Sequence, residues 1–286
     1  MISFIKNSIA AAFAITTGLF TFVPETIFGS VSWVSQNNLS QCNLLADFSA
    51  KEVNVVLSRC LSFLAIWIVV SLFYALYLKF RKKKTIYGSN YSICIEYGDI
   101  FNVEDCKRVI SFDECFTTHV GNGIADVKAS SICGQYLANH PDIDIQRLIE
   151  NAQVLPARGK SKHQQRLRYE SGTIIPNGED LLLAFARLDE RGKGRFFTRD
   201  EYVYCLDKLW KEIECYYCEM DVCIPILGAG ITSFEGGDGS SITQQELLDI
   251  IIRSYVLSSH KIKAPHKLRI VCKPTKGFSI NKIRAC

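Results

Sequence analysis

Several features that mark common classes of protein are scarce or absent in this sequence. Proline is rare, at 7 of 286 residues, and 48% of the residues are hydrophobic, so the composition excludes a disordered chain. The net charge of +4 is far below the basic excess that is typical of nucleic-acid-binding proteins. The phosphate-binding patterns G-x-x-x-x-G-K-[ST] and G-x-G-x-x-G are both missing. We therefore expect no P-loop and no nucleic-acid partner.

Two long uncharged stretches lie near the N-terminus. Residues 7–24 contain no charged side chain, and residues 60–78 read CLSFLAIWIVVSLFYALYL. A helix of the second length spans roughly 28 Å, close to the thickness of the hydrocarbon core of a bilayer. The sequence therefore predicts two transmembrane helices. A cleaved signal peptide is the alternative for residues 1–24, because Lys6 precedes the first apolar stretch, although no small-x-small cleavage motif follows it.

The charges that flank these stretches predict an orientation. Five basic residues occur between Lys79 and Lys84, whereas the loop at 25–59 carries two basic and three acidic residues. The positive-inside rule then places loop 25–59 outside and both termini in the cytoplasm. We expect a multi-pass protein of the cell inner membrane, with a two-helix transmembrane region at 1–84 and a cytoplasmic domain at 85–286. A capping box of Ser49 and Glu52 predicts that the second helix begins near residue 50 and continues to residue 80.

Cysteine is plentiful, but its spacing does not indicate a metal site. Of the 12 cysteines, ten follow residue 84, where a cytoplasmic location would keep them reduced. Cys215 and Cys218 have a ligand-like spacing, yet a structural zinc site needs a second pair, and the chain has none. We therefore expect packed thiols, no disulfide framework and no bound metal.

From about residue 85 the chain alternates strand-like and helix-like segments. Such alternation predicts an α/β sheet covered by helices on both faces. Residues 81–85 read as a short basic linker, and the basic stretch 157–168 as a solvated loop. Strands are expected at 92–97, 108–112, 172–175, 181–186, 222–227 and 268–272, and helices at 124–137, 143–152, 198–220 and from 243 onward. Thr198 with Glu201, and Thr243 with Glu246, are the capping boxes predicted for the last two helices.

Three predicted strands end in glycine-containing turns. Gly98-Asp99-Ile100 follows the first strand, Val120-Gly121-Asn122-Gly123 is expected to open the first helix, and Gly228-Ala229-Gly230 follows a late strand. Ligands of open α/β sheets bind outside the carboxyl ends of the strands, and glycine lets backbone N–H groups approach phosphate oxygens. An acidic side chain such as Asp99 can accept a hydrogen bond from an adenine amino group. These turns are therefore the candidate ligand-binding segments, although ordinary turns have the same composition.

Taken in order, the motifs of residues 90–275 resemble a macrodomain, the ADP-ribose-binding α/β/α module. More specifically, they resemble the macrodomain of ThsA-type effectors from Thoeris anti-phage systems, in the branch that carries transmembrane helices. The resemblance implies a three-layer α/β/α macrodomain preceded by two transmembrane α-helices. The motifs that carry it are GDIF at 98–101, SFDECFTT at 111–118, SICGQYL at 131–137, YESGT at 169–173, DLLLAFARLDERGKG at 180–194, LDKLW at 206–210, IPILGAGI at 224–231 and QQELLDIII at 244–252.

The resemblance also implies a function and a set of partners. In that branch, a TIR-domain enzyme makes an ADP-ribose-derived signal, histidine-ADP-ribose, and the macrodomain binds it. The transmembrane helices, assembled as a homo-oligomer, then disrupt the lipid bilayer. This function requires no cofactor and no catalytic residue. The residues implied to bind the ligand are Asp99 and Ile100 at the adenine, Gly121, Gly123, Gly228, Ala229, Gly230 and Ile231 at the diphosphate, and Asp113 and Phe116 at the distal ribose.

Two departures from the family pattern leave the distal end of the site open. Asp113 stands where macrodomains usually have Asn, and Phe116-Thr117-Thr118 stands where relatives tend to have Phe-Asp-Thr. Asp113 suits a substituent with a positive charge, or it lies outside the pocket. The alternative function is a membrane-tethered ADP-ribosyl hydrolase, for which Asp113, Glu114 and His119 are the candidate acid–base residues by type.

Overall fold

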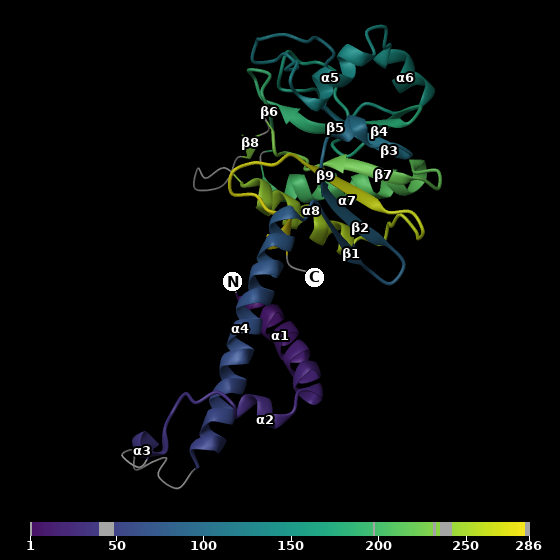
Figure 1. The fold of residues 1–286 in the computed structure, drawn as a ribbon. Helices are drawn as coiled ribbons and strands as arrows, with labels where there is room; N and C mark the ends of the chain where they lie inside the picture. Colours follow the sequence, from purple (N-terminus) through teal and green to yellow (C-terminus); the bar gives the residue numbers. More distant parts are fainter. Residues whose placement is uncertain (1, 40–48, 197, 231–232, 235–241, 284–286) are drawn as a thin grey trace. The chain divides into compact units, whose positions relative to one another are not determined.

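The computed structural model describes residues 2–39, 49–196, 198–230, 233–234 and 242–283, and the chain divides into two compact units, residues 1–81 and 82–286 (Figure 1). The first unit consists of helices. Two of them, α1 and α4, are long and apolar enough to cross a membrane by length and composition. The helices of this unit are α1 (Ile2–Phe22), α2 (Glu25–Phe28), α3 (Gln36–Leu39) and α4 (Ala50–Phe80).

The long helix α4 has the predicted bounds for a physical reason at each end. Ser49 accepts a hydrogen bond from the Glu52 backbone N–H, and the Glu52 carboxylate accepts one from the Ser49 backbone N–H, which completes the capping box. The helix ends where Arg81 adopts an extended conformation. Its 31 residues span about 46 Å, which exceeds a hydrocarbon core of about 30 Å.

Helices α1 and α4 pack along one another through small and polar side chains. Ser8, Ala12 and Thr16 lie one helical turn apart on α1 and are all buried. Trp67 on α4 donates its indole N–H to the Ser8 hydroxyl at 3.2 Å, and Asn7 donates to the Tyr74 hydroxyl at 3.2 Å. The contact between these helices is therefore specified by hydrogen bonds in addition to apolar packing.

The second unit is built on one mixed sheet with the strand order β1-β2-β9-β7-β3-β5-β6-β8, and β4 pairs with β5 at the side. Strands β2, β9, β7, β3 and β5 are parallel to one another, and β1 and β4 are antiparallel to their neighbours. The strands are β1 (Lys83–Tyr87), β2 (Ser92–Tyr97), β3 (Cys106–Asp113), β4 (Ile174–Asn177), β5 (Asp180–Leu188), β6 (Gly194–Phe196), β7 (Asp221–Pro225), β8 (Ser233–Phe234) and β9 (Leu268–Cys272).

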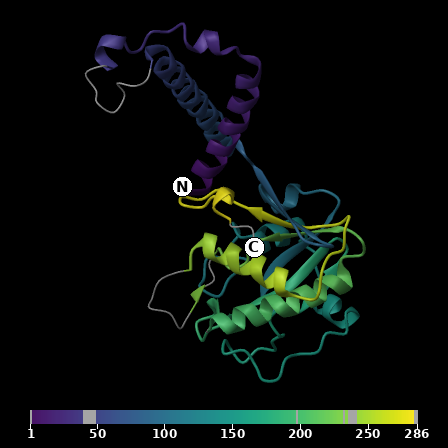
Figure 2. The same ribbon diagram turned by 90° about the horizontal axis from the view of Figure 1, so that it is seen from below.

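Helices cover both faces of this sheet, as expected (Figure 1). Successive side chains of a strand point to opposite faces, so Leu183 packs against α7 and α8 whereas Leu182 packs against α5 and α6. Figure 2 shows α7 and α8 side by side on their face of the sheet. The α-helices of this unit are α5 (Ile132–Asn139), α6 (Ile145–Asn151), α7 (Arg199–Tyr216) and α8 (Gln244–Leu257), and two short 3₁₀ helices are η1 (Ile100–Asn102) and η2 (Ile280–Lys282).

Two expectations about the chain before and after β3 are wrong. The basic run that was expected to form a linker enters the sheet as β1, where Lys83 pairs with Glu96 of β2 at 3.7 Å. The expected helix at 124–137 begins only at Ile132, because Ser131 caps it by accepting from the Gly134 N–H at 3.0 Å. Residues 114–131 instead form a long segment of turns.

The helix expected at 198–220 also differs from the prediction at both ends. It stops at Tyr216, and Cys218 and Glu219 adopt positive φ angles of 50° and 55°. At its N-terminus Thr198 caps the helix by accepting from the Glu201 N–H, but the Glu201 carboxylate reaches Arg187 of β5 at 2.5 Å. A competing ion pair on the neighbouring strand therefore takes the acidic side chain that the sequence assigned to the helix cap.

Candidate functional site

The five parallel strands end at one edge of the sheet, and this edge carries most of the predicted ligand-binding residues. Gly98 follows β2 and donates its N–H to the carbonyl of Cys272 at the end of β9. Asp113 is the last residue of β3, and the segment 226–230 follows β7 directly. Because these strands run in parallel, the topology brings the 98–100, 113–116 and 228–230 segments to the same edge.

Asp99 and Ile100 have separate structural roles at this edge. Asp99 caps η1, and its Oδ1 accepts from the Phe101 N–H at 3.1 Å. Among the described residues its Oδ2 has no partner, so it is free to accept a hydrogen bond from a ligand. The Ile100 side chain is 3% exposed and packs on Cys106, Cys223 and Val271. Only the backbone of Ile100 therefore faces the edge, and its side chain anchors the turn.

Asp113 and Phe116 shape the turn after β3. Asp113 Oδ1 accepts from the N–H groups of Cys115 at 2.8 Å and Thr117 at 3.3 Å. Burial, together with the Asp113 carboxylate, raises the pKa of the Cys115 thiol to about 11. Phe116 has a positive φ of 50°, is 3% exposed and stacks between Phe112 and Tyr169 in the core beneath α5 and α6. Its ring thus belongs to the core in this structure.

The glycine loop at 121–123 differs from the expectation. It does not open a helix, because eight residues separate Gly123 from the start of α5. Instead, Gly123 donates its N–H to Asp126 Oδ2 at 2.6 Å. A Cβ atom at Gly121 would lie 2.4 Å from the same oxygen. The Asp126 carboxylate therefore fills the position beside these glycines that a ligand anion was expected to take.

The loop after β7 is open. Gly228 has a φ of +85°, which glycine adopts without strain, and a Cβ atom added at Gly230 would meet no described atom within 4 Å. The Leu227 carbonyl accepts from the buried Tyr202 hydroxyl at 2.9 Å, which fixes the start of this loop on α7. Ala229 N–H closes a turn onto the Ile226 carbonyl. Ile231, the last predicted residue of this loop, lies outside the described residues.

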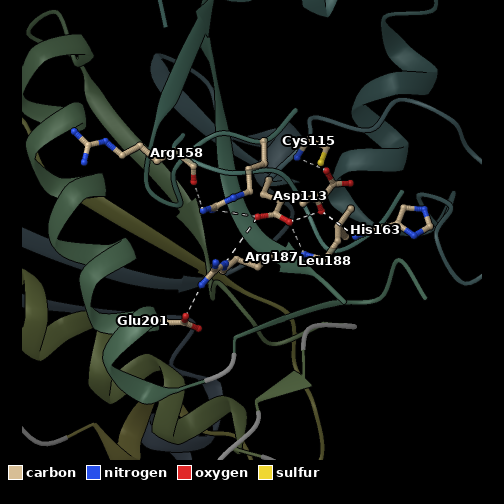
Figure 3. Close-up of polar contacts among 10 residues, drawn as sticks. Asp113, Cys115, Arg158, His163, Arg187, Leu188 and Glu201 are labelled. Atoms are coloured by element: carbon tan, nitrogen blue, oxygen red, sulfur yellow. Dashed lines mark hydrogen bonds and ion pairs between the residues drawn. The ribbon is translucent and has the colours of Figure 1, made fainter. Parts of the chain in front are cut away.

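A buried ionic cluster beside the edge was not expected from the sequence (Figure 3). Glu114 follows β3, is 1% exposed, and accepts at Oε1 from the Ser161 hydroxyl at 2.6 Å and the Leu188 N–H at 3.1 Å. Its Oε2 accepts no hydrogen bond from any described residue but lies 3.6 Å from Arg168 Nη1 and 3.9 Å from Arg187 Nε. The cluster attaches the basic segment 157–168, expected as a solvated loop, to the ends of β3 and β5.

The three acid–base candidates of the hydrolase alternative are used differently in this structure. Glu114 is enclosed in the ionic cluster, and Asp113 caps its own turn. His119 is 78% exposed at its side chain and lies 3.9 Å from Asp126 Oδ1. No local sequence pattern indicates the ionic cluster, because residues 114, 161, 168 and 187 are far apart along the chain.

Two cavities in the second unit include no predicted ligand-binding residue among their lining residues. The larger, of about 1000 Å³, runs along α7 and is lined by Arg168, Arg187, Tyr204 and Lys208 among others. The smaller, of about 540 Å³, lies between α5 and the segment containing His119 and Val120. Among the described residues no group of three or more His, Cys, Asp or Glu side chains is arranged to hold a metal ion.

The strand order and the helices on both faces define a three-layer α/β/α macrodomain, preceded by a helical unit. The chain belongs to the family described as Thoeris protein ThsA, Macro domain, whose sequence model matches residues 93–273. Thoeris protein ThsA of Bacillus amyloliquefaciens (strain Y2) is 29% identical in an alignment of 208 residues, and the alignment covers 68% of this chain and 66% of that relative. The match thus spans just under two thirds of the relative's length.

Solved macrodomain structures also resemble this chain at low sequence identity. A point mutant of the Oceanobacillus iheyensis macrodomain aligns with a TM-score of 0.41 and 11% identity, over 68% of this chain and 90% of that one. The same macrodomain with ADP aligns with a TM-score of 0.37 and 11% identity, over 67% and 88%. The macrodomain of Thermus aquaticus DarG aligns with a TM-score of 0.34 and 14% identity, over 64% and 98%.

Proposed function

We propose that this chain is a membrane-bound Thoeris effector that senses an ADP-ribose-derived nucleotide and responds by disrupting the bilayer. The observation that carries the proposal is the combination of a ThsA-type macrodomain with two helices long and apolar enough to span a membrane. The signal is of the histidine-ADP-ribose class and comes from a TIR-domain partner that consumes NAD. The chain itself binds the signal and performs no catalysis.

The ligand lies along the carboxyl edge of the sheet in this proposal. The unpartnered Oδ2 of Asp99 accepts from the adenine amino group, and the open backbone at 228–230 approaches the diphosphate. Gly121 and Gly123 take the other side of the diphosphate once the Asp126 carboxylate moves away. The segment 113–116 meets the distal ribose, with Asp113 and the backbone around Phe116 as the contacts.

The helical unit supplies the membrane response. The basic residues from Lys79 to Lys84 face the cytoplasm by the positive-inside rule, so both termini are cytoplasmic and the protein is a multi-pass protein of the inner membrane. Two helices cannot enclose an aqueous path, so several copies must combine. Gly18 has open space on α1, and Thr17 and Thr21 beside it are exposed, whereas Thr16 faces α4. This small-residue surface is the natural contact with a second copy.

Dye release from liposomes that contain the full-length protein tests this function. ADP-ribose and its histidine conjugate are added from the side exposed to the macrodomain, and AMP is the ligand control. Release that requires one of the first two ligands, and that is lost in both Asp99→Ala and Gly18→Leu, supports the proposal. Conversion of the conjugate to free ADP-ribose without dye release overturns it in favour of the membrane-tethered hydrolase.

A further inference from the structure

The basic segment 157–168, here called the basic loop, is folded onto the carboxyl edge of the sheet. Its two arms are joined by hydrogen bonds from the Ala157 N–H to the Arg168 carbonyl and from the Ser161 N–H to the Arg166 carbonyl, both at 2.9 Å. Ser161 is 1% exposed and donates to the buried Glu114. A polar side chain that is this deeply buried and hydrogen-bonded fixes the loop in one position.

The loop reaches two of the segments that the proposed function assigns to the ligand. Arg166 donates from Nη1 to the Thr117 hydroxyl at 3.0 Å, next to the turn formed by Asp113 and Phe116. On the other side, a Cβ atom at Gly192 would lie 2.4 Å from Ala125 Cβ and 3.0 Å from His163 Cε1. His163 therefore lies against the same turn as the 121–126 glycine loop. Figure 3 shows Asp113, Cys115 and His163 together on one side of the ionic cluster, with Arg158 on the other.

The charge of the basic loop is concentrated and only partly neutralised. The loop contains five Lys and Arg residues and no acidic residue, so its charge exceeds the net +4 of the whole chain. Arg168 lies near Glu114, but Arg166, which is half-buried, has no acidic partner among the described residues. One of its N–H groups is used by Thr117, which leaves the remaining donors of the guanidinium without a partner in the part of the chain that the structure describes.

These donors of the Arg166 guanidinium are therefore available to an anionic ligand. Asp113, on the same turn, accepts at Oδ1 from two backbone N–H groups, and no ion pair joins it to Arg166 among the described residues. A carboxylate and a guanidinium therefore both lie near the position proposed for the distal ribose. The expectation that Asp113 suits a substituent with a positive charge stays a prediction.

We infer that the basic loop is a wall of the ligand site and that Arg166 binds an anionic oxygen at the β-phosphate end of the ligand. Glu114 acts through Ser161 and Arg168 as the positioning residue of this wall. The inference rests on the proposed function, because it assumes that an ADP-ribose-type ligand occupies the carboxyl edge. It also explains specificity, because ligands that lack the β-phosphate and distal ribose gain no binding affinity from Arg166.

Calorimetry of the full-length protein in nanodiscs, with ADP-ribose and with AMP as probes, tests the inference. We expect Arg166→Ala to weaken ADP-ribose binding by about tenfold or more, as for the loss of a charged hydrogen bond, and AMP binding by less than about twofold. Arg166→Lys should recover part of the loss. Lys160→Ala is the matched control, because it removes one positive charge from an exposed position of the same loop.

The positioning role of Glu114 needs a separate readout. Glu114→Gln keeps the acceptor for Ser161 and Leu188 but removes the charge beside Arg168, so we expect faster proteolysis within 157–168 and a weaker affinity for ADP-ribose only. Equal losses for both probes in Arg166→Ala, or the same loss in Lys160→Ala, would overturn the inference while the proposed function survives. A wild-type protein that binds neither probe, and does not bind the histidine conjugate of ADP-ribose either, overturns the proposed function itself, and the inference with it.

Discussion

The two glycine loops at the carboxyl edge have the same G-x-G spacing, but one is open to a ligand and the other is closed by a side chain of the protein. At 228–230 the backbone is open at Gly230, where a side chain would meet no described atom within 4 Å. At 121–123 the Asp126 carboxylate lies against both glycines and accepts from the Gly123 N–H. Glycine at these positions makes backbone N–H groups accessible, but a nearby acid decides whether they remain available to a ligand.

The difference shows what a glycine pattern alone predicts. Asp126 stands where the third glycine of a G-x-G-x-x-G pattern would fall, and this one side chain closes the loop. Lys128 strengthens the closed form by donating from Nζ to the Gly123 carbonyl at 2.5 Å. The open loop is therefore the better candidate for binding a diphosphate directly, and the closed loop has to rearrange first.

The largest effect that we expect is at the open loop. Gly230→Val should abolish binding of ADP-ribose to the full-length protein, because its side chain fills the space that the diphosphate needs. The melting temperature should stay at the wild-type value, since no described atom is displaced. Calorimetry and a thermal melt on the same sample measure both quantities.

Gly228→Val is the comparison variant for this prediction. The φ of +85° at Gly228 disfavours any side chain, so this variant should lose about 1–2 kcal/mol of stability together with affinity, whereas Gly230→Val should lose affinity alone. If Gly230→Val keeps its fold and binds ADP-ribose normally, the 228–230 loop does not belong to the site.

A smaller effect is expected at Asp99, in the turn that lies at the same edge as both loops. Asp99→Ala should weaken ADP-ribose binding by about 1–3 kcal/mol, the loss of a hydrogen bond to a buried polar partner. Asp99→Asn distinguishes the loss of the hydrogen bond to the ligand from the loss of the η1 cap, because the Asn oxygen can still accept from the Phe101 N–H. Unchanged affinity in both variants would mean that Asp99 only caps the turn.

Opening the closed loop should act in the opposite direction. Asp126→Ala frees the Gly123 N–H and removes a negative charge from the region of the diphosphate, so we expect several-fold tighter binding of ADP-ribose. Asp142→Ala is the control, because it makes the same change in net charge at an exposed position. Equal affinities in the wild type and Asp126→Ala would show that the loop stays closed in the complex.

The sequence predicts the layers of this fold well where local patterns decide the structure. Strands β2 and β9 have the predicted bounds, and the capping boxes of α4 and α8 occur at the predicted residues. Where a distant charge competes, the local pattern fails. Glu201 pairs with Arg187 instead of completing a helix cap, and Lys83 pairs with Glu96 in a strand that reads as a linker.

The candidate site is predictable to a smaller extent, and for the same reason. The ends of parallel strands follow from the strand order, so Asp99, Asp113 and Gly228 could be assigned to one edge. The role of Glu114 could not, because its partners Ser161 and Arg168 follow it by more than 45 residues in a segment that has no regular secondary structure. A pattern of charges gives no indication of which pairs meet in space.

The smallest effect expected concerns the helices that follow the two loops. In α8, after the open loop, hydrogen bonds from the Thr243 backbone N–H and hydroxyl lower the pKa of the Glu246 carboxyl from its usual value of 4.5. A lowered folded-state pKa means that ionised Glu246 stabilises the fold above the unfolded pKa, and that this contribution is lost as the pH falls through the folded pKa. The melting temperature of Glu246→Ala should therefore lie slightly below that of the wild type at pH 7, and the gap should close as the pH falls below about 4.5.

The helix after the closed loop, α5, provides the comparison. It is capped by Ser131 and has no acidic residue in its first turn, so the loss of melting temperature in Ser131→Ala should stay constant over the same pH range. Differential scanning of the full-length variants from pH 7 to pH 3 measures both gaps. A gap for Glu246→Ala that widens toward low pH would contradict the sign of the pKa shift, and with it the capping role of the carboxylate. If the difference in melting temperature between the wild type and Ser131→Ala also disappears at low pH, both helices respond to the net charge of the protein and not to their own caps.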